Sequence, residues 1–183
     1  MKFLAGIVRL VDGLNDKIGY LVSWLTTLMV AVVIYDVFTR YVLRSSSVAV
    51  QEMEWHIFSL IFLIGGAYTL KEEGHVRVDI FYSRFSARGK AWIDLVGGVV
   101  FLVPFCLLVI WTSHQFVAMS WMTREMSPDP GGLPGRYLLK AAIPAGFVLI
   151  LVQGIAQTLR ALLTVLGHPL AGPAPTGGEV DHA

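Results

Sequence analysis

Residues 95–113 read LVGGVVFLVPFCLLVIWTS, a run of 19 residues without one charged side chain. A helix rises about 1.5 Å per residue, and the hydrocarbon core of a bilayer is roughly 30 Å thick, so a helix of this length is expected to cross it. Three further apolar segments lie at residues 20–35, 55–70 and 141–159. We therefore predict an all-α integral membrane protein with four transmembrane helices and the lipid bilayer as its solvent.

The segment at 55–70 is short for a span, whereas the other two reach spanning length once their flanks are included. Glu52 and Glu54 stand just before it, so we expect its outer end to be tilted or sheltered by protein. The small residues 65–67 inside it predict a close approach by a second helix. Pro104, in the run at 95–113, predicts a kink there.

The composition of the chain agrees with a membrane protein. Of its 183 residues, 55% are hydrophobic and 15% are charged, whereas a soluble domain carries roughly 25% charged residues. The net charge of +1 argues against a nucleic-acid partner. Cys106, the single cysteine, permits no intrachain disulfide and is expected to fill apolar space. The first apolar stretch starts late, runs long and lacks a small-residue cleavage site, which argues against a cleaved signal peptide.

Basic residues are distributed unevenly between the two predicted faces of the membrane. Nine lie on one side, namely Lys2, Arg9, Lys17, Lys71, Arg77, Arg84, Arg88, Lys90 and Arg160. Five lie on the other, namely Arg40, Arg44, Arg124, Arg136 and Lys140. Because the more basic face is usually cytoplasmic, we predict that both termini and the 71–90 connection are in the cytoplasm.

Three regions make up the predicted domain organisation. Residues 1–18 place apolar side chains at helical spacing opposite basic ones, which is typical of an amphipathic helix lying in the membrane surface. The same pattern fits a cytoplasmic extension of the first span. Residues 19–166 form the four-helix domain. Residues 167–183 have the composition of a disordered tail.

Several charged side chains lie at the predicted outer face. Asp36 and Arg40 are four residues apart, so they share a helix face and are expected to pair; the pair serves either as an interfacial anchor or as an inter-subunit contact. Glu52 and Trp55 share one side of the second helix, and Glu54 points elsewhere. Acidic groups at a membrane edge indicate function, although the dipole of a solvated helix start explains them nearly as well. The Pro- and Gly-rich connection at 122–139 predicts an ordered turn.

A rival interpretation is a four-helix membrane cytochrome, with His56 and His114 as axial haem ligands. Only this one histidine pair is available for it. The chain lacks an H-E-x-x-H motif, a C-x-x-C pair, a glycine-rich phosphate loop and a plausible serine triad. The middles of the spans carry no charge and no internal repeat, unlike a transporter that works alone. The sequence therefore predicts neither an enzyme nor a metal or cofactor site.

Residues 52–81, EMEWHIFSLIFLIGGAYTLKEEGHVRVDIF, resemble the small permease subunit of tripartite ATP-independent periplasmic (TRAP) transporters, the DctQ type. In that family an aromatic-acidic segment precedes the second helix, and a Gly-Ala run and a His-Val-Arg-Val-Asp motif follow. The similarity extends from about Tyr20 to Leu163. The family usually has adjacent glutamates before this helix, whereas Met53 separates the two here.

The resemblance implies a multi-pass protein of the bacterial inner membrane, which scaffolds a large permease subunit and helps a periplasmic solute-binding protein to dock. It implies sodium-driven uptake of organic acids such as dicarboxylates. The cytoplasmic loop motif of His75, Arg77 and Asp79 is expected to fix the turn between the second and third spans, or to be a plain basic loop. The candidates for partner docking or inter-subunit contact are Asp36, Arg40, Arg44, Glu52, Glu54, Trp55, Arg124 and Arg136.

Overall fold

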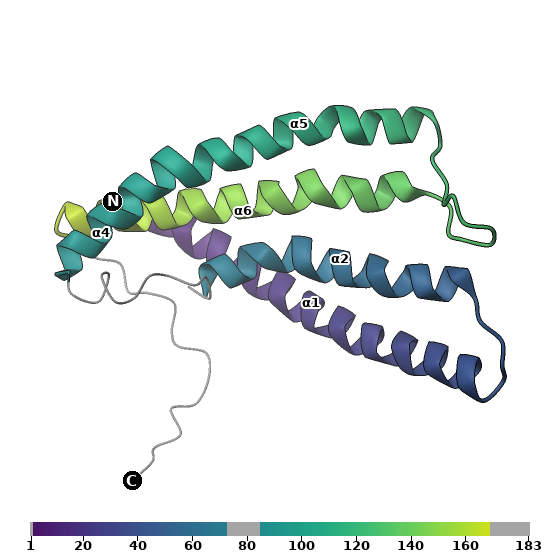
Figure 1. Ribbon diagram of the computed structural model, residues 1–183. Helices are drawn as coiled ribbons and strands as arrows, with labels where there is room; N and C mark the ends of the chain where they lie inside the picture. Colours follow the sequence, from purple (N-terminus) through teal and green to yellow (C-terminus); the bar gives the residue numbers. More distant parts are fainter. Residues whose placement is uncertain (1, 73–84, 169–183) are drawn as a thin grey trace, which may run out of the picture.

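The chain is all-helical in the computed structural model, which describes residues 2–72 and 85–168 (Figure 1). The elements are α1 (Lys2–Tyr41), α2 (Val48–Lys71), α4 (Ala87–Gly97), the π-helical turn η1 (Gly98–Leu102), α5 (Val103–Met122) and α6 (Arg136–Val165). Because α4, η1 and α5 run on without a break, four helical rods result. Each is long and apolar enough to cross a membrane. The predicted all-α class and the four spanning helices are confirmed.

Helix α6 is the centre of the arrangement. It packs against α1, α2, α4 and α5, whereas α5 packs extensively on α6 alone, beyond its own rod. Figure 1 shows the rods side by side in the order α5, α6, α2 and α1 over much of their length, so they form an open layer, and the first part of α1 crosses to α6. We call the end with the 42–47 and 123–135 connections the loop end. The opposite end, where α1 starts and α6 stops, is the terminal end.

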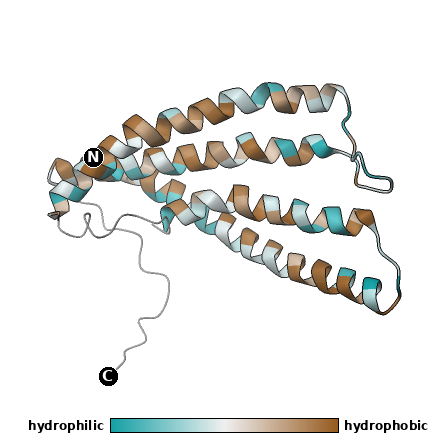
Figure 2. Cartoon of the chain, in the orientation of Figure 1, coloured by the Kyte–Doolittle hydropathy of each residue, from teal (hydrophilic) through white to brown (hydrophobic). Residues whose placement is uncertain are grey.

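Most of the apolar surface of this layer is uncovered. Within the most apolar window of each rod, only 11–22% of the residues are buried. Hydrophobic residues accordingly line the outside of the rods over much of their length (Figure 2). Such a surface requires lipid or a partner protein around it.

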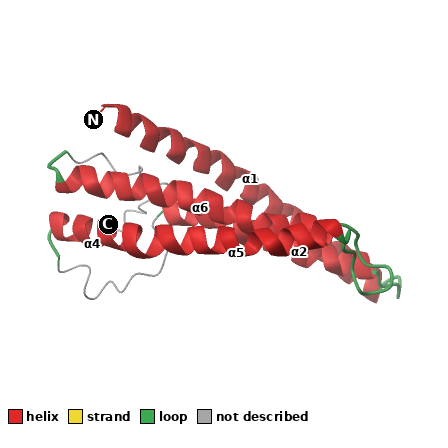
Figure 3. Cartoon of the chain, turned by 90° about the horizontal axis from the view of Figure 1, so that it is seen from above, coloured by secondary structure: helices red, strands yellow, loops and turns green. Residues whose placement is uncertain are grey.

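The first helix is longer than expected. It runs through 40 residues without a break at residue 18, so it is about 60 Å long. The segment 2–18 therefore belongs to the same continuous helix as the first span. Val8 and Val11 pack against Ala156 of α6. Seen from above, α1 lies at an angle to the other rods (Figure 3). A position of this segment in the membrane surface stays a prediction.

Small residues bring α2 close to its neighbours, as the sequence suggested. A side chain at Gly66 would contact Ile150 of α6, and one at Gly65 would contact Val22 of α1. The tightest approach to α2 is at Gly146 of α6, where an added Cβ would lie 2.4 Å from the carbonyl oxygen of Leu63. At this point the backbones of α2 and α6 are nearly in contact.

The irregularity expected at Pro104 takes the form of a π-helical turn that ends at Leu102, two residues before the proline. Proline has no backbone N–H, and its ring clashes with the carbonyl four residues earlier in a regular α-helix. The wider turn of a π-helix relieves that clash. On the same stretch Gly98 lies against Thr158, so the irregular turn sits at the seam with α6.

Candidate docking surface at the loop end

Glu52 organises the loop end. Its side chain lies near the start of α2, and the residue is only 4% exposed. The hydroxyl of Ser127 donates to its Oε1 at 2.5 Å, and the backbone N–H of Leu133 donates to its Oε2 at 2.6 Å. The Arg136 guanidinium lies 3.5 Å from Oε1. The expectation that protein shelters this end of the second span is therefore met by the 123–135 connection.

The connection is held in one shape by its own backbone. Ser127 N–H donates to the carbonyl of Leu133, and Arg136 N–H donates to the carbonyl of Glu125. Gly132 has no room for a side chain, because a Cβ there would lie 2.8 Å from Glu52 Oε2. The turn predicted from proline and glycine is thus ordered, and a carboxylate from a different helix fills its centre.

Basic and aromatic side chains surround this centre. Arg136 lies over the ring of Trp55, with 5.7 Å between the guanidinium carbon and the ring centroid, a cation–π geometry. Lys140 pairs with Glu125 and lies 4.1 Å from the ring centroid of Phe116. The loop end is therefore rigid and rich in charges that are already paired within the chain.

The hydrogen bond from Lys140 lowers the pKa of Glu125 from its ordinary value of 4.5. A carboxyl group whose pKa is lower in the folded state than in the unfolded state stabilises the folded protein at any pH above the unfolded-state pKa. This stabilisation is lost as the pH falls through the folded-state pKa. Arg136 nearby acts in the same direction.

We expect the wild type to melt at a higher temperature than Glu125→Gln at pH 7. This difference should persist down to about pH 4.5 and vanish at more acidic pH, as Glu125 becomes protonated. Thermal unfolding of both proteins in detergent from pH 7 to pH 3 measures it. A gap between the two melting temperatures that stays constant over this range would show that the carboxylate charge does not hold the loop.

The other residues predicted at the outer face differ in how far they are exposed and paired. Asp36 is 2% exposed and pairs with Arg40, as predicted, so the exposed end of the pair is the arginine. Glu54 is half-buried. Arg44 and Arg124 are exposed, have positive φ angles of 51° and 46°, and make no side-chain bond with the described part of the chain. Their cationic groups are open to a partner.

The terminal end holds a polar cluster that the sequence analysis did not single out. Asn15 of α1 donates to Gln153 Oε1 of α6 at 2.7 Å, and Gln153 donates to Asp12 at 3.2 Å. Arg160 also donates to Asp12, at 2.5 Å. Gln153 is fully buried. The amide and carboxylate groups at the α1–α6 contact therefore bond with one another.

Helix α2 joins the same end of the molecule. Lys71, which the sequence analysis counted with the basic loop, is only 4% exposed and pairs with Asp16 and Glu72. Gln157 Nε2 donates to the carbonyl of Leu70 at 2.6 Å. A signal for this cluster existed, because Asp12, Asn15 and Asp16 share one helix face, as do Gln153, Gln157 and Arg160.

The two remaining site predictions have different outcomes. His75, Arg77 and Asp79 lie outside the described residues. The haem interpretation has no support, because His56 lies on α2 and His114 on α5, and α6 separates these two helices (Figure 1). Among the described residues, no group of three or more His, Cys, Asp or Glu side chains is placed to hold a metal ion.

Comparison with known proteins gives one positive result. A family model described as "Tripartite ATP-independent periplasmic transporters, DctQ component" matches residues 29–164, which is well over half of the chain and reaches from the last third of α1 almost to the end of α6. No curated protein matches the chain.

Proposed function

Because this chain belongs to the DctQ component family of TRAP transporters, and so is the small membrane subunit of such a transporter, we propose that it is a scaffold. Its role is to hold the large membrane subunit in place and to present the loop end to a solute-binding protein. In this proposal the chain assembles the transporter and does not itself carry solute.

The observation that carries the proposal is the exposed apolar surface of the rods. A protein that worked alone would gain packing by closing its helices into a bundle, whereas here α5 packs extensively on α6 alone, beyond its own rod. Large side chains such as Phe62, Phe101 and Trp111 are more than 70% exposed. These surfaces suit a broad contact with another set of membrane helices, with lipid on the other face.

The buried polar groups also favour a scaffold over a carrier. A solute site needs polar groups that are free to bind a ligand near the middle of the membrane. In the described part of the chain, the buried Gln153 and Asn15 already bond with each other across α1 and α6. We infer that these amides fix the register of the two helices.

The orientation and chemistry of the complex follow as further parts of the proposal. The basic-residue asymmetry favours cytoplasmic termini in the bacterial inner membrane, with the loop end in the periplasm. Leu10 and Leu14, exposed on the first turns of α1, suit contact with the cytoplasmic membrane surface. Organic-acid transport driven by sodium is the expected activity of the complex, with selectivity in the other two subunits.

One surface is proposed for partner contact, and one loop motif is proposed to fix the shape of the chain itself. At the loop end, we propose that the solute-binding protein contacts Arg40, Arg44 and the exposed part of the 123–135 connection. The ion pair of Glu52 with Arg136 keeps this connection in shape. At the cytoplasmic turn, the motif of His75, Arg77 and Asp79 is proposed to fix the connection between α2 and α4.

We expect the purified chain to recover a much larger multi-span protein when both are expressed from their own operon. Proteoliposomes with this chain alone should not take up an organic acid under an inward sodium gradient. Proteoliposomes with both membrane subunits and the solute-binding protein should do so. The readouts are recovery of the large subunit by affinity purification and uptake of labelled solute.

Two outcomes would contradict the scaffold. Sodium-coupled uptake by the chain alone would make it a carrier. Full uptake by the large subunit and the solute-binding protein, without this chain, would make the scaffold dispensable. A Soret absorption band in the purified protein would independently revive the haem interpretation.

A further inference from the structure

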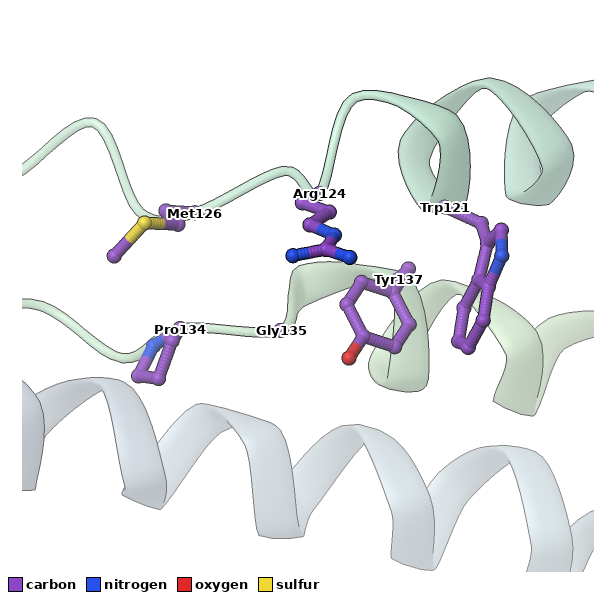
Figure 4. Close-up of a pocket in the computed structure, with 6 residues that line it drawn as sticks. All are labelled: Trp121, Arg124, Met126, Pro134, Gly135 and Tyr137. Carbon is purple, nitrogen blue, oxygen red and sulfur yellow. The ribbon is translucent and has the colours of Figure 1, made fainter.

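A pocket of about 440 Å³ opens at the loop end, between the end of α5 and the start of α6. Trp121, Arg124, Met126, Pro134, Gly135 and Tyr137 line it. Trp121 and Tyr137 form one wall, with their rings edge to face and 4.7 Å between centroids. Figure 4 shows the guanidinium of Arg124 pointing down from the connection toward the start of α6 and the Tyr137 ring. A single cation thus faces a mainly apolar recess.

Arg124 is available to a ligand. It is exposed, and its guanidinium makes no hydrogen bond or ion pair with any described residue. By contrast, the neighbouring cations Arg136 and Lys140 are paired with Glu52 and Glu125. An unpaired guanidinium in an open pocket favours an anion with several oxygen acceptors, because its planar N–H groups can donate to two of them at once.

The backbone around the pocket is fixed before any ligand arrives. Glu125 N–H donates to the Ser120 carbonyl at 3.0 Å, and Arg136 N–H donates to the Glu125 carbonyl at 3.1 Å. These bonds tie both ends of the connection to each other and to α5. A ligand therefore loses little free energy to ordering the site.

The surroundings indicate what kind of anion fits. Two apolar side chains at the pocket are exposed: Met126 of the lining is 62% exposed, and Leu138, which lies next to the lining residue Gly135, is 67% exposed. They lie where two spanning helices end, which is the depth at which tryptophan and tyrosine meet lipid headgroups. A small water-soluble anion makes no contact with these apolar side chains, whereas a phospholipid places its phosphate on the cation and its acyl chains on the apolar side chains.

We infer that this pocket binds the phosphate of an anionic phospholipid, with Arg124 as its charge partner and Trp121 and Tyr137 against the glycerol and the first acyl carbons. Arg124 is also among the predicted docking residues; the pocket gives it a lipid ligand in place of a protein one. The inference needs only that the chain spans a membrane, and so it is independent of the scaffold proposal.

The test uses the full chain in a mild detergent and titrates phosphatidylglycerol by native mass spectrometry. Arg124→Asn should weaken retention of one lipid about tenfold, because it removes a charge-assisted bond. Asparagine tolerates the positive φ angle of this position. Arg44→Asn is the matched control, since Arg44 is also exposed, unpaired and at positive φ at the loop end. It should leave lipid retention within about twofold of the wild type.

A second variant guards against misfolding of the first. Met126 is 62% exposed on the pocket lining, so Met126→Glu should fold normally and repel the phosphate, with a similar loss of phosphatidylglycerol. Inorganic phosphate at equal concentration should not displace the lipid. Equal lipid retention by wild type and both pocket variants would overturn the inference. So would displacement by free phosphate, or a pocket that ignores lipid and binds the solute-binding protein through Arg124.

Discussion

Gly146→Ala is expected to be among the most damaging single-atom additions to this chain. The new Cβ would lie 2.4 Å from the Leu63 carbonyl oxygen and 3.3 Å from the Leu63 Cβ. Backbone atoms cannot rotate away as a flexible side chain can, so α2 and α6 must separate. Overpacking of this kind typically costs about 1–3 kcal/mol. Since α6 contacts every other helix, the separation should also weaken assembly with the large subunit.

Gly97→Ala is the matched control for that experiment. Gly97 is also helical, but a Cβ there would have nothing within 4 Å. Alanine at an open helical position should raise stability by about 0.5–1 kcal/mol. Denaturation in mixed detergent micelles, followed by tryptophan fluorescence, should therefore move in opposite directions for the two variants. Equal stability of Gly146→Ala and the wild type would mean that the close contact between α2 and α6 can relax.

Local sequence patterns predict those features of the fold that depend on neighbouring residues alone. The four spans follow from long apolar runs, because an uncharged stretch of about 20 residues has few other stable forms. The pairing of Asp36 with Arg40 follows from their spacing on one helix. The small residues at 65–67 were correctly expected at a helix contact, because two helix backbones can approach each other closely only where the side chains between them are small.

What the sequence analysis missed depends on which helices become neighbours. The bonds from α6 to Asp12 and Asn15 join residues 138–148 positions apart, and no local pattern contains that pairing. The same holds for Glu52, whose partners Ser127 and Leu133 are 75 and 81 residues away. Two interpretations of residues 2–18 stayed open from the sequence, because an amphipathic pattern is the same in a surface helix and in an extension of a span.

This distinction bears on how the loop end works. Charged residues near a membrane edge invite an interpretation as a docking surface, yet most of those at the loop end are paired inside the chain. Glu52, Glu125, Arg136 and Lys140 give the connection its shape, and Arg44 and Arg124 are left to meet other molecules. One set of side chains therefore fixes the shape of the 123–135 connection, and another set is free to contact partner molecules. Mutations can test the two roles separately.

Glu52→Ala is expected to release the 123–135 connection while the four rods stay folded. The variant removes the acceptor of Ser127 and Leu133 and leaves Arg136 without its carboxylate. Hydrogen bonds to charged groups are the strong ones, so amide exchange over residues 123–136 should accelerate roughly tenfold to hundredfold. Docking of the solute-binding protein should fall in parallel, because its proposed contact surface no longer has a single shape.

Glu54→Ala is the control for this prediction. Glu54 is an acid two residues further along α2 and makes no hydrogen bond or ion pair with the described part of the chain. Its removal should leave amide exchange of the connection unchanged. Faster exchange in Glu52→Ala with undiminished docking would place the contact surface outside the 123–135 connection. Unchanged exchange would mean that the backbone bonds alone hold the loop, and Glu52 would then lose its central role.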